Sequence, residues 1–301
     1  MVLGRLGGYR KAGRSMADLR GAIVLVTGAA SGIGRATALE AASRGARMVL
    51  TDIAEDGLDR TVRDITDSGG TVVSSRALDV SVYEQVRDFA DAVHAEVGSV
   101  DVVMNIAGIS AWGTVENMAH ETWKALVDVN LMGPIHVVES FVPPMVTAGR
   151  GGHLVNVSSS AGLLAYPWHA AYSASKFGVR GMSEVLRFDL ARHGIGVSLV
   201  VPGAVRTPLV DTVQIAGVDR SEPRVAKLAA RFDKRAVSPE VVAEKILTGM
   251  ARRHFLIYSS NDIRVGYWVA RKFALPYEVA MQAANDHFSS LLQPPRRGRR
   301  R

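Results

Sequence analysis

Two hydrophobic patterns alternate along the chain, and together they predict an α/β fold. Short runs of β-branched and other apolar residues predict buried strands. Longer segments with apolar residues three and four positions apart predict helices. The predicted strands are 23–27, 48–51, 72–78, 100–105, 154–157, 197–201 and 255–258. The predicted helices are 33–43, one ending near 67, 83–97, about 118–147, 170–193 and one from 239. This alternation predicts a parallel sheet covered on both faces.

Two stretches depart from this regular pattern. Within 118–147 a bend is expected near Gly133-Pro134 or near Pro143-Pro144, because proline removes a helical hydrogen bond. Residues 204–236 lack a clean period and predict a loop with short helices.

The rest of the chain is divided by position and composition. No linker interrupts it, so the pattern predicts one domain at 19–260 and a C-terminal amphipathic helical extension at 261–293. The extension is expected to break at Pro276, and to cover a pocket, pack between subunits or contact a membrane, in that order. The ends are a flexible basic N-terminal arm at 1–18 and a disordered Arg-rich tail at 294–301.

The positive charge of the chain is concentrated at these two ends. The net charge of +7 comes from 36 Lys and Arg against 29 Asp and Glu. The first twenty residues carry +4 and the last eight carry +5, which leaves −2 for the remainder. A near-neutral body favours solvated tails, so we expect no nucleic-acid partner. Weak peripheral contact of the tails with an acidic membrane stays open.

The composition also limits the chemistry. Cysteine is absent, which excludes disulfides, a thiolate nucleophile and a cysteine-ligated metal. His153, His169 and His193 share no metal-ligand spacing, so we expect no metal and place them at the surface or the rim of a pocket. No segment reaches the roughly 18 unbroken apolar residues of a membrane span. These observations favour a cytoplasmic protein.

A glycine-rich turn joins the first predicted strand to the first predicted helix. Its sequence is Thr27-Gly28-Ala29-Ala30-Ser31-Gly32-Ile33-Gly34. Glycine permits a sharp turn and the close approach of a phosphate, which the free N–H groups of the helix attract. A glycine cluster is also typical of an ordinary strand–helix turn, but its position after a buried strand favours a dinucleotide site. The expected cofactor contacts are Thr27, Gly28, Ser31, Gly32, Ile33 and Gly34.

Asp52 follows Gly28 by 24 residues, at the end of the second predicted strand. A carboxylate there can accept hydrogen bonds from both hydroxyls of the adenosine ribose and repels a 2′-phosphate. NAD is therefore favoured over NADP, although Arg35 and Arg44 remain candidates for contact with such a phosphate. The alternative role of Asp52 is to cap the next helix.

Tyr172 and Lys176 lie four residues apart, on one face of a predicted helix. A phenol with a pKa of about 10 is a poor base at neutral pH, and a nearby lysine cation lowers that pKa. Such a pair is usually just two exposed helical neighbours. Here Ser159 precedes Tyr172 by 13 residues at the end of the fifth predicted strand, where it can stabilise a substrate oxygen. Ser158 and Ser160 compete for this role, and the spacing favours Ser159.

In these motifs the chain resembles the short-chain dehydrogenase/reductase superfamily over roughly residues 19–260. The matching motifs are Thr27–Gly34, Asn105-Ile-Ala-Gly108, Asn130, Ser159, Tyr172-x-x-x-Lys176 and Pro202-Gly203 through Thr207. The resemblance implies a Rossmann-type, doubly wound, parallel seven-stranded sheet in a single domain with a C-terminal helical extension. It also implies a homodimer or homotetramer.

The resemblance further implies the role of each residue. Tyr172 would be the acid/base and Ser159 would orient the substrate oxygen. Lys176 would bind the nicotinamide ribose and tune Tyr172, while Asn130 would hold a water in a proton relay. Further cofactor contacts are implied at Asp79, Val80, Asn105, Ala107, Gly108, Pro202, Gly203, Val205 and Thr207, besides Tyr172 and Lys176. One departure is Ile106, where the family has a second asparagine, and we expect it to affect cofactor binding only modestly.

The expected function is an NAD(H)-dependent interconversion of a secondary alcohol and a ketone. An apolar substrate is expected, resembling a steroid, a retinoid or another lipid, because the predicted pocket segments are apolar. The expected lining residues are Trp112, Leu163, Leu164, Tyr166, Trp168, Leu209, Val213 and Ile215. The alternatives are an NADP-dependent 3-ketoacyl reductase and a nonenzymatic NAD-binding protein.

Overall fold

A parallel sheet of seven strands forms the centre of the molecule, in the order β3-β2-β1-β4-β6-β7-β9. The computed structural model describes residues 16, 18–209, 214–217 and 236–292. The strands are β1 (Ile23–Thr27), β2 (Arg47–Asp52), β3 (Thr71–Ala77), β4 (Val102–Asn105), β6 (Gly152–Val157), β7 (Ile195–Val201) and β9 (Leu256–Tyr258). The strand order reverses between β1 and β4, which makes this the switch point where ligands of open α/β sheets bind.

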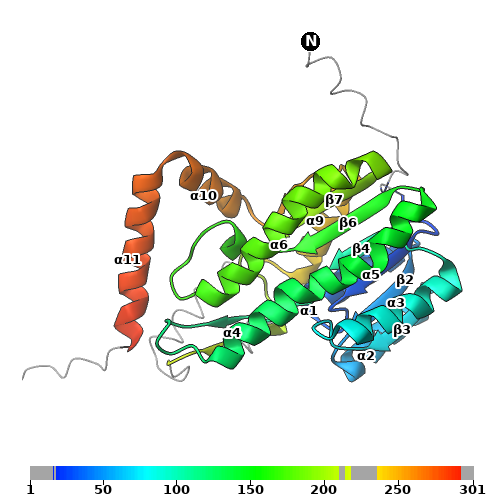
Figure 1. Ribbon diagram of the computed structural model, residues 1–301, viewed down its shortest axis with the longest axis horizontal. Coiled ribbons are helices and arrows are strands. Elements are labelled where there is room, and N and C mark those ends of the chain that lie inside the picture. The colour runs from blue at the N-terminus through cyan, green and yellow to red at the C-terminus, as the bar shows by residue number, and fades with distance from the viewer. Residues whose placement is uncertain (1–15, 17, 210–213, 218–235, 293–301) are drawn as a thin grey trace, which may run out of the picture.

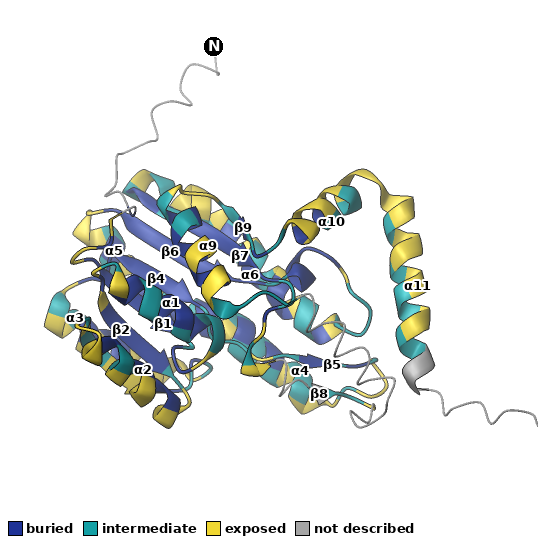
Figure 2. Cartoon of the chain, turned by 180° about the vertical axis from the view of Figure 1, so that it is seen from behind, coloured by how far each residue is buried: buried dark blue, intermediate teal, exposed yellow. Residues whose placement is uncertain are grey.

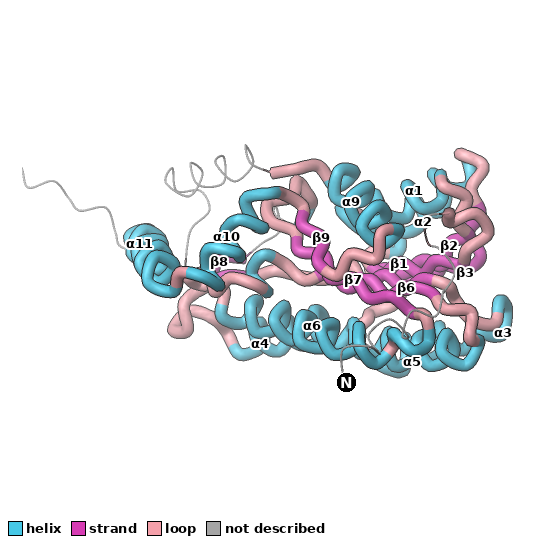
Figure 3. The backbone as a smooth tube through the Cα atoms, turned by 90° about the horizontal axis from the view of Figure 1, so that it is seen from above, coloured by secondary structure: helices cyan, strands magenta, loops and turns pink. Residues whose placement is uncertain are grey.

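Helices cover both faces of the sheet (Figures 1 and 3). One face carries α1 (Gly32–Ser43), α2 (Glu55–Asp67) and α9 (Pro239–Ala251). The other carries α3 (Tyr83–Val97), α4 (His120–Val127), α5 (Gly133–Ala148) and α6 (Ala170–Asp189). The expected doubly wound, seven-stranded fold is confirmed, together with a C-terminal helical extension formed by α10 (Asn261–Lys272) and α11 (Ala274–Leu292).

The apolar runs of the sequence become strands buried on both faces (Figure 2). Alternate residues of β1 contact opposite layers: Val24 and Val26 pack with α1 and α9, whereas Leu25 packs with α3 and α5. Because successive side chains of a strand point to opposite faces, a two-sided core requires an unbroken apolar run. The run from Ile23 to Val26 meets this requirement, and each of these residues is buried.

Several predicted boundaries were wrong by a few residues. The strand expected at 100–105 begins at Val102, and the helix expected to reach 193 ends at Asp189 before a short 3-10 turn. The break in the extension lies at Phe273 rather than at Pro276. Pro276 is accommodated in the first turn of α11, where a missing N–H costs no helical hydrogen bond.

The bend expected within 118–147 is a π-helical turn, Asp128–Met132, between α4 and α5. It ends at Gly133, whose N–H donates to the carbonyl of Asp128. Pro134 follows, and it cannot supply the N–H that an α-helix would direct at the carbonyl of Asn130. Of the two expected positions, the irregularity therefore adjoins Gly133-Pro134, while Pro143 and Pro144 lie inside α5.

The helical stretch His120–Ala148 is the single described helix long and apolar enough to cross a membrane, with a mean hydropathy of 1.3. Of its most apolar window, 39% is buried inside the fold. Leu126, Phe141 and Met145 are among its buried side chains. The core helix of a soluble protein passes the same test of length and composition.

The expectation for His153 was wrong, because this side chain is fully buried in the sheet between β4 and β7. Its Nε2 lies 2.8 Å from Ser198 Oγ. Burial, reinforced by the positive charge of Arg253, lowers the pKa of His153 to about 3. The folded state therefore holds this ring neutral at pH values where an unfolded chain would protonate it.

His153 is expected to make the protein less stable in mild acid. Its contribution to stability is complete above the unfolded pKa of 6.5 and is lost as the pH falls toward about 3. This group alone adds a slope of at most ~1.4 kcal/mol per pH unit to the free energy of unfolding. In urea unfolding between about pH 7 and pH 5, His153→Gln should flatten that slope. The exposed His120→Gln serves as the matched control, and an equal slope in wild type and His153→Gln would refute the assignment.

Candidate active site

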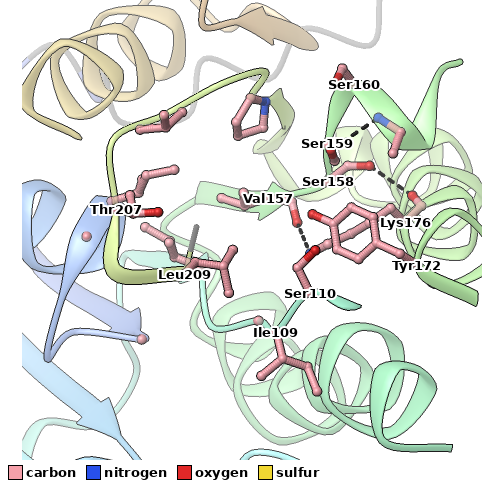
Figure 4. Close-up of a pocket in the computed structure, with 18 of the residues that line it drawn as sticks. Ile109, Ser110, Val157, Ser158, Ser159, Ser160, Tyr172, Lys176, Thr207 and Leu209 are labelled. Carbon is pink, nitrogen blue, oxygen red and sulfur yellow. Dashed lines mark hydrogen bonds between the residues drawn. The ribbon is translucent and has the colours of Figure 1, made fainter. Parts of the chain in front are cut away.

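A cavity of about 1120 Å³ opens along the carboxyl ends of β1, β4 and β6. It extends from the glycine-rich turn to the N-terminal part of α6 and on to α11. Figure 4 shows Ser159, Tyr172 and Lys176 on one side, with Thr207 and Leu209 opposite them. The predicted cofactor and catalytic residues that line this cavity are Gly28, Ser31, Gly32, Ile33, Gly34, Asp52, Asp79, Val80, Ala107, Gly108, Ser159, Tyr172, Lys176, Pro202, Gly203, Val205 and Thr207.

The glycine-rich turn has the geometry that a dinucleotide requires. Gly28 has a φ of +71°, and a Cβ there would lie 2.9 Å from the Cα of Ala107. A Cβ on Gly34 would lie only 1.9 Å from the carbonyl oxygen of Gly28. Ser31, the N-cap of α1, makes no side-chain hydrogen bond to the first turn. The N–H groups of that turn are thus left for an anion, and the residues present fit a pyrophosphate.

Thr27 is buried behind this turn rather than in the cavity wall. Its hydroxyl oxygen accepts hydrogen bonds from the backbone N–H groups of Ile106 at 3.0 Å and Ala107 at 3.1 Å. The side chain therefore joins the end of β1 to the segment after β4. Ile106, which departs from the family pattern, makes this contact through its backbone, so it does not depend on the side chain.

Asp52 lines the cavity, as expected for a ribose contact, and also accepts a hydrogen bond at the start of the next helix. One carboxylate oxygen accepts from the N–H of Ala30 and the other from the N–H of Ala54, each at 2.9 Å. Ala54 is the N-cap of α2, and Ala30 belongs to the glycine-rich turn. A carboxylate has about four acceptor positions, so Asp52 keeps capacity for ribose hydroxyls in the cavity that it lines.

The two basic residues considered for a 2′-phosphate are engaged elsewhere. Arg35 forms an ion pair with Asp64 of α2. Arg44 forms an ion pair with Glu40, one turn earlier in α1. Each guanidinium therefore already has a carboxylate partner.

Lys176 is buried within α6, and its ammonium group is held at the end of β6. Its Nζ donates to the carbonyl oxygen of Val157 at 3.1 Å (Figure 4). A Cβ on Gly108 would lie 3.3 Å from this nitrogen, so the missing side chain keeps the ammonium open to the cavity. Burial lowers the pKa of Lys176 to about 8, so the group remains mostly protonated at neutral pH.

Tyr172 lies beside this lysine, whose Nζ is 5.8 Å from the centre of the phenol ring. Burial raises the pKa of Tyr172, and a hydrogen bond with Ser159 opposes that rise. From the sequence we expect Lys176 to lower this pKa. In the protein without bound ligands, burial has the larger effect on the pKa of Tyr172, because a low-dielectric site penalises the phenolate.

Neighbouring contacts distinguish the three serines that compete for the role beside Tyr172. Ser159 lies near enough to the phenol of Tyr172 to oppose the rise that burial causes in its pKa, and the Ser159 hydroxyl oxygen accepts from the N–H of Ala161 at 3.1 Å. Ser158 instead donates to the carbonyl oxygen of Lys176 at 2.9 Å (Figure 4). Ser160 acts in the same way on the pKa of Tyr166. Of the three, Ser159 is the one that acts on Tyr172.

Two predicted site residues are supports behind the wall. The amide of Asn130 binds the backbone of Ile109 twice, through Oδ1 at 2.8 Å and Nδ2 at 2.9 Å. Asn130 thus pins the π-helical turn to the segment after β4. The side chain of Asn105 donates to Asn156 at 2.9 Å, and it is buried below the cavity.

The chain matches known proteins over most of its length. Residues 22–217 match the family described as short chain dehydrogenase. SadH of Mycobacterium tuberculosis, which is named as a putative oxidoreductase, is 38% identical over 277 residues, which are 91% of this chain and 98% of SadH. The chain belongs to the short-chain dehydrogenase family. The resemblance found in the sequence motifs is confirmed, and with it membership of an oxidoreductase family that binds a nicotinamide dinucleotide.

Two further members give a sense of the family's range. FabG, a 3-oxoacyl-(acyl-carrier-protein) reductase of Thermotoga maritima, is 36% identical over 229 residues, which are 76% of this chain and 90% of FabG. A Burkholderia phymatum short-chain dehydrogenase/reductase, solved with NAD, is 32% identical with a TM-score of 0.76, over 84% of this chain and 93% of that one. Solved structures of the family contain NAD or NADP.

On the substrate side of this short-chain dehydrogenase, part of the expected lining is correct. The cavity is lined by Trp112, Tyr166, Leu209 and Ile215. Trp112 and Ile215 belong to two short paired strands, β5 (Ala111–Trp112) and β8 (Gln214–Ile215). Leu163 and Leu164 instead pack in a hydrophobic cluster with α10. Trp168 contacts Phe288, and Val213 lies outside the described residues.

Sequence reasoning missed several lining residues. Ile109 and Ser110 follow Gly108 and also line the cavity. His169, expected at the surface or the rim of a pocket, lines it one helical turn before Tyr172. His287 and Phe288 come from α11, more than a hundred positions after Tyr172, where no local pattern links them to the site. Their position supports the first expectation for the extension, that it covers the pocket. In the described part of the chain, no group of His, Asp and Glu side chains could hold a metal ion.

Thr27 is expected to be needed for the stability of this site. Thr27→Val keeps the shape of the side chain but removes the acceptor for two backbone N–H groups. It should lower the free energy of unfolding by about 1–3 kcal/mol. Thr27→Ser retains the hydroxyl and is the matched control in urea unfolding. Equal losses in the two variants would show that the methyl group, not the hydroxyl, matters.

Proposed function

We propose that the protein is an NAD(H)-dependent oxidoreductase that interconverts a secondary alcohol and a ketone, with Tyr172 as the acid/base. The observation that carries the proposal is the grouping of Tyr172, Ser159 and the buried ammonium of Lys176 in the cavity that begins at the glycine-rich turn. The apolar and aromatic lining supports an apolar substrate.

In the direction of oxidation, Tyr172 accepts the proton of the substrate hydroxyl. Ser159 holds the same oxygen by a hydrogen bond and stabilises the negative charge that develops on it. The phenolate form of Tyr172 is costly in a buried site, and the Lys176 ammonium offsets part of this cost. When bound, the nicotinamide dinucleotide supplies the hydride acceptor.

The choice of NAD rests on the charges around the adenosine end. Asp52 lines the cavity at the end of β2, where a 2′-phosphate would meet a carboxylate. Arg35 and Arg44 are paired with carboxylates, so each would have to exchange its partner to contact that phosphate. An NADP-dependent 3-ketoacyl reductase remains the second candidate, favoured by the 36% identity to FabG. The same carboxylate argues against it.

Tyr172→Phe tests the acid/base role. It should lower kcat by about 10²–10⁴-fold, because the proton loses its positioned acceptor, while NAD still binds. Turnover is followed by NADH absorbance with a panel of apolar secondary alcohols, and NAD binding by calorimetry. Tyr83→Phe, an exposed tyrosine of α3, is the control. Full turnover by Tyr172→Phe would remove Tyr172 from the mechanism.

Asp52→Asn tests the choice of cofactor. The change keeps an acceptor oxygen but removes the charge, so the ratio of NAD to NADP affinities should fall by about 10–100-fold. Calorimetric Kd values for both dinucleotides give this ratio directly. Asp59→Asn, on the exposed side of α2, should leave it unchanged. A ratio that stays the same in Asp52→Asn would show that the charge of Asp52 does not determine the choice of cofactor.

A further inference from the structure

The cavity is large for a ligand pocket. Its volume of about 1120 Å³ lies above the usual upper range of ~1000 Å³ for ligand pockets. Beyond Tyr172 the wall becomes aromatic, with Trp112, Tyr166, His169 and Phe288 among the lining residues. These flat surfaces favour a planar ring as the neighbour of the reacting carbon.

His169 is the polar group in this aromatic wall whose geometry is most completely defined. Its ring lies 4.6 Å from that of Trp112 at an angle of 34°, and it meets Tyr166 edge-on at 5.8 Å. Trp112 is itself fixed, because its Nε1 donates to Ser110 Oγ at 3.0 Å. The His169 ring is therefore held on two sides, and its centre lies 6.3 Å from that of Tyr172.

The hydrogen bonds of His169 determine which nitrogen carries the proton. Nδ1 lies 2.7 Å from the carbonyl oxygen of Pro167, which can only accept, so Nδ1 is the donor. Burial lowers the pKa of His169, which keeps the ring neutral at neutral pH. Nε2 is then an acceptor with an available lone pair. It has no hydrogen-bond partner among the described residues, and it is not enclosed by them.

We propose that His169 Nε2 is a second anchor for the substrate and that it accepts a hydrogen bond from a hydroxyl other than the one that reacts. The inference rests on the proposed function and names its substrate class. This class is a planar, ring-bearing ketone or alcohol with a second hydroxyl. Tyr172 and Ser159 hold the reacting oxygen, Trp112 and Phe288 contact the ring, and His169 receives the second hydroxyl.

The test compares the binding of hydroxyacetophenones with that of their methyl ethers. The ortho, meta and para isomers of each are titrated by calorimetry into the full chain saturated with NAD⁺. A ketone and NAD⁺ cannot react, so the measurement reports binding alone. At least one hydroxy isomer should bind about 3–10-fold more tightly than its ether, which cannot donate. His169→Phe keeps a ring against Trp112 and should abolish this preference.

Matched variants separate the anchor from a structural role. His193→Phe, which removes a histidine outside the cavity, should retain the preference. His169→Gln, which restores an acceptor, should recover part of it. A preference that persists in His169→Phe, no preference in the wild type, or no saturable binding of any hydroxy isomer would overturn the inference.

A second measurement does not depend on any variant. Nitrogen NMR of the histidine rings at neutral pH should show His169 neutral and protonated on Nδ1, and an Nε2–H form would contradict the anchor. NADH-dependent reduction of the same ketones tests the proposed function separately. Binding preference without reduction would leave the anchor intact and refute the oxidoreductase proposal, whereas reduction without preference would do the reverse.

Discussion

The contact between the ends of β1 and β4 is the constraint on which the site depends. Gly28 lies so close to Ala107 that a single Cβ would collide with the backbone, and the Thr27 hydroxyl ties the same two segments together. This contact sets the glycine-rich turn against the segment that ends at Gly108. Gly108 in turn leaves open a space that both Asn130 Oδ1 and Lys176 Nζ border. The glycine-rich turn and the part of the cavity that holds Lys176 are therefore joined through a few backbone contacts.

Burial acts in opposite directions on the two central ionisable groups. It raises the pKa of Tyr172 and lowers that of Lys176, so each group alone resists its charged form. A phenolate beside an ammonium relieves both costs at once. The site is thus suited to forming the charged pair together, when substrate and dinucleotide have displaced water. A hydrogen bond to the carbonyl of Val157 holds the ammonium of this pair, and Ser159 opposes the rise in the pKa of the phenol.

The parts of the molecule that sequence could predict are those encoded by neighbouring residues. The strand from Ile23 to Thr27, the turn after it and the Tyr172–Lys176 spacing each depend on local chemistry, and the structure has them in the expected elements. The burial of His153 was not predicted, because the sequence around it does not show that Ser198 of β7 is its hydrogen-bond partner. The contribution of α11 could not be predicted either, since it depends on how a distant helix packs.

For Asn130, the sequence pattern predicted a position at the site. It did not predict which groups the side chain contacts there. In the structure Asn130 lies in a π-helical turn, and its side chain holds the backbone of Ile109. The π-helical turn adjoins Gly133-Pro134. The sequence predicted a bend at these two residues but not the form of the bend. Local pattern thus identified the site residues more reliably than it described what each one touches.

We infer that Asp52 and the Tyr172–Lys176 pair lie at the two ends of one dinucleotide site. A crystal structure of the chain with NAD would show whether they do. We expect ribose hydroxyls of the adenosine within about 2.6–3.2 Å of the Asp52 carboxylate, and the nicotinamide between Thr207 and Tyr172. A dinucleotide bound in the reverse direction, or with its adenosine ribose away from Asp52, would contradict it.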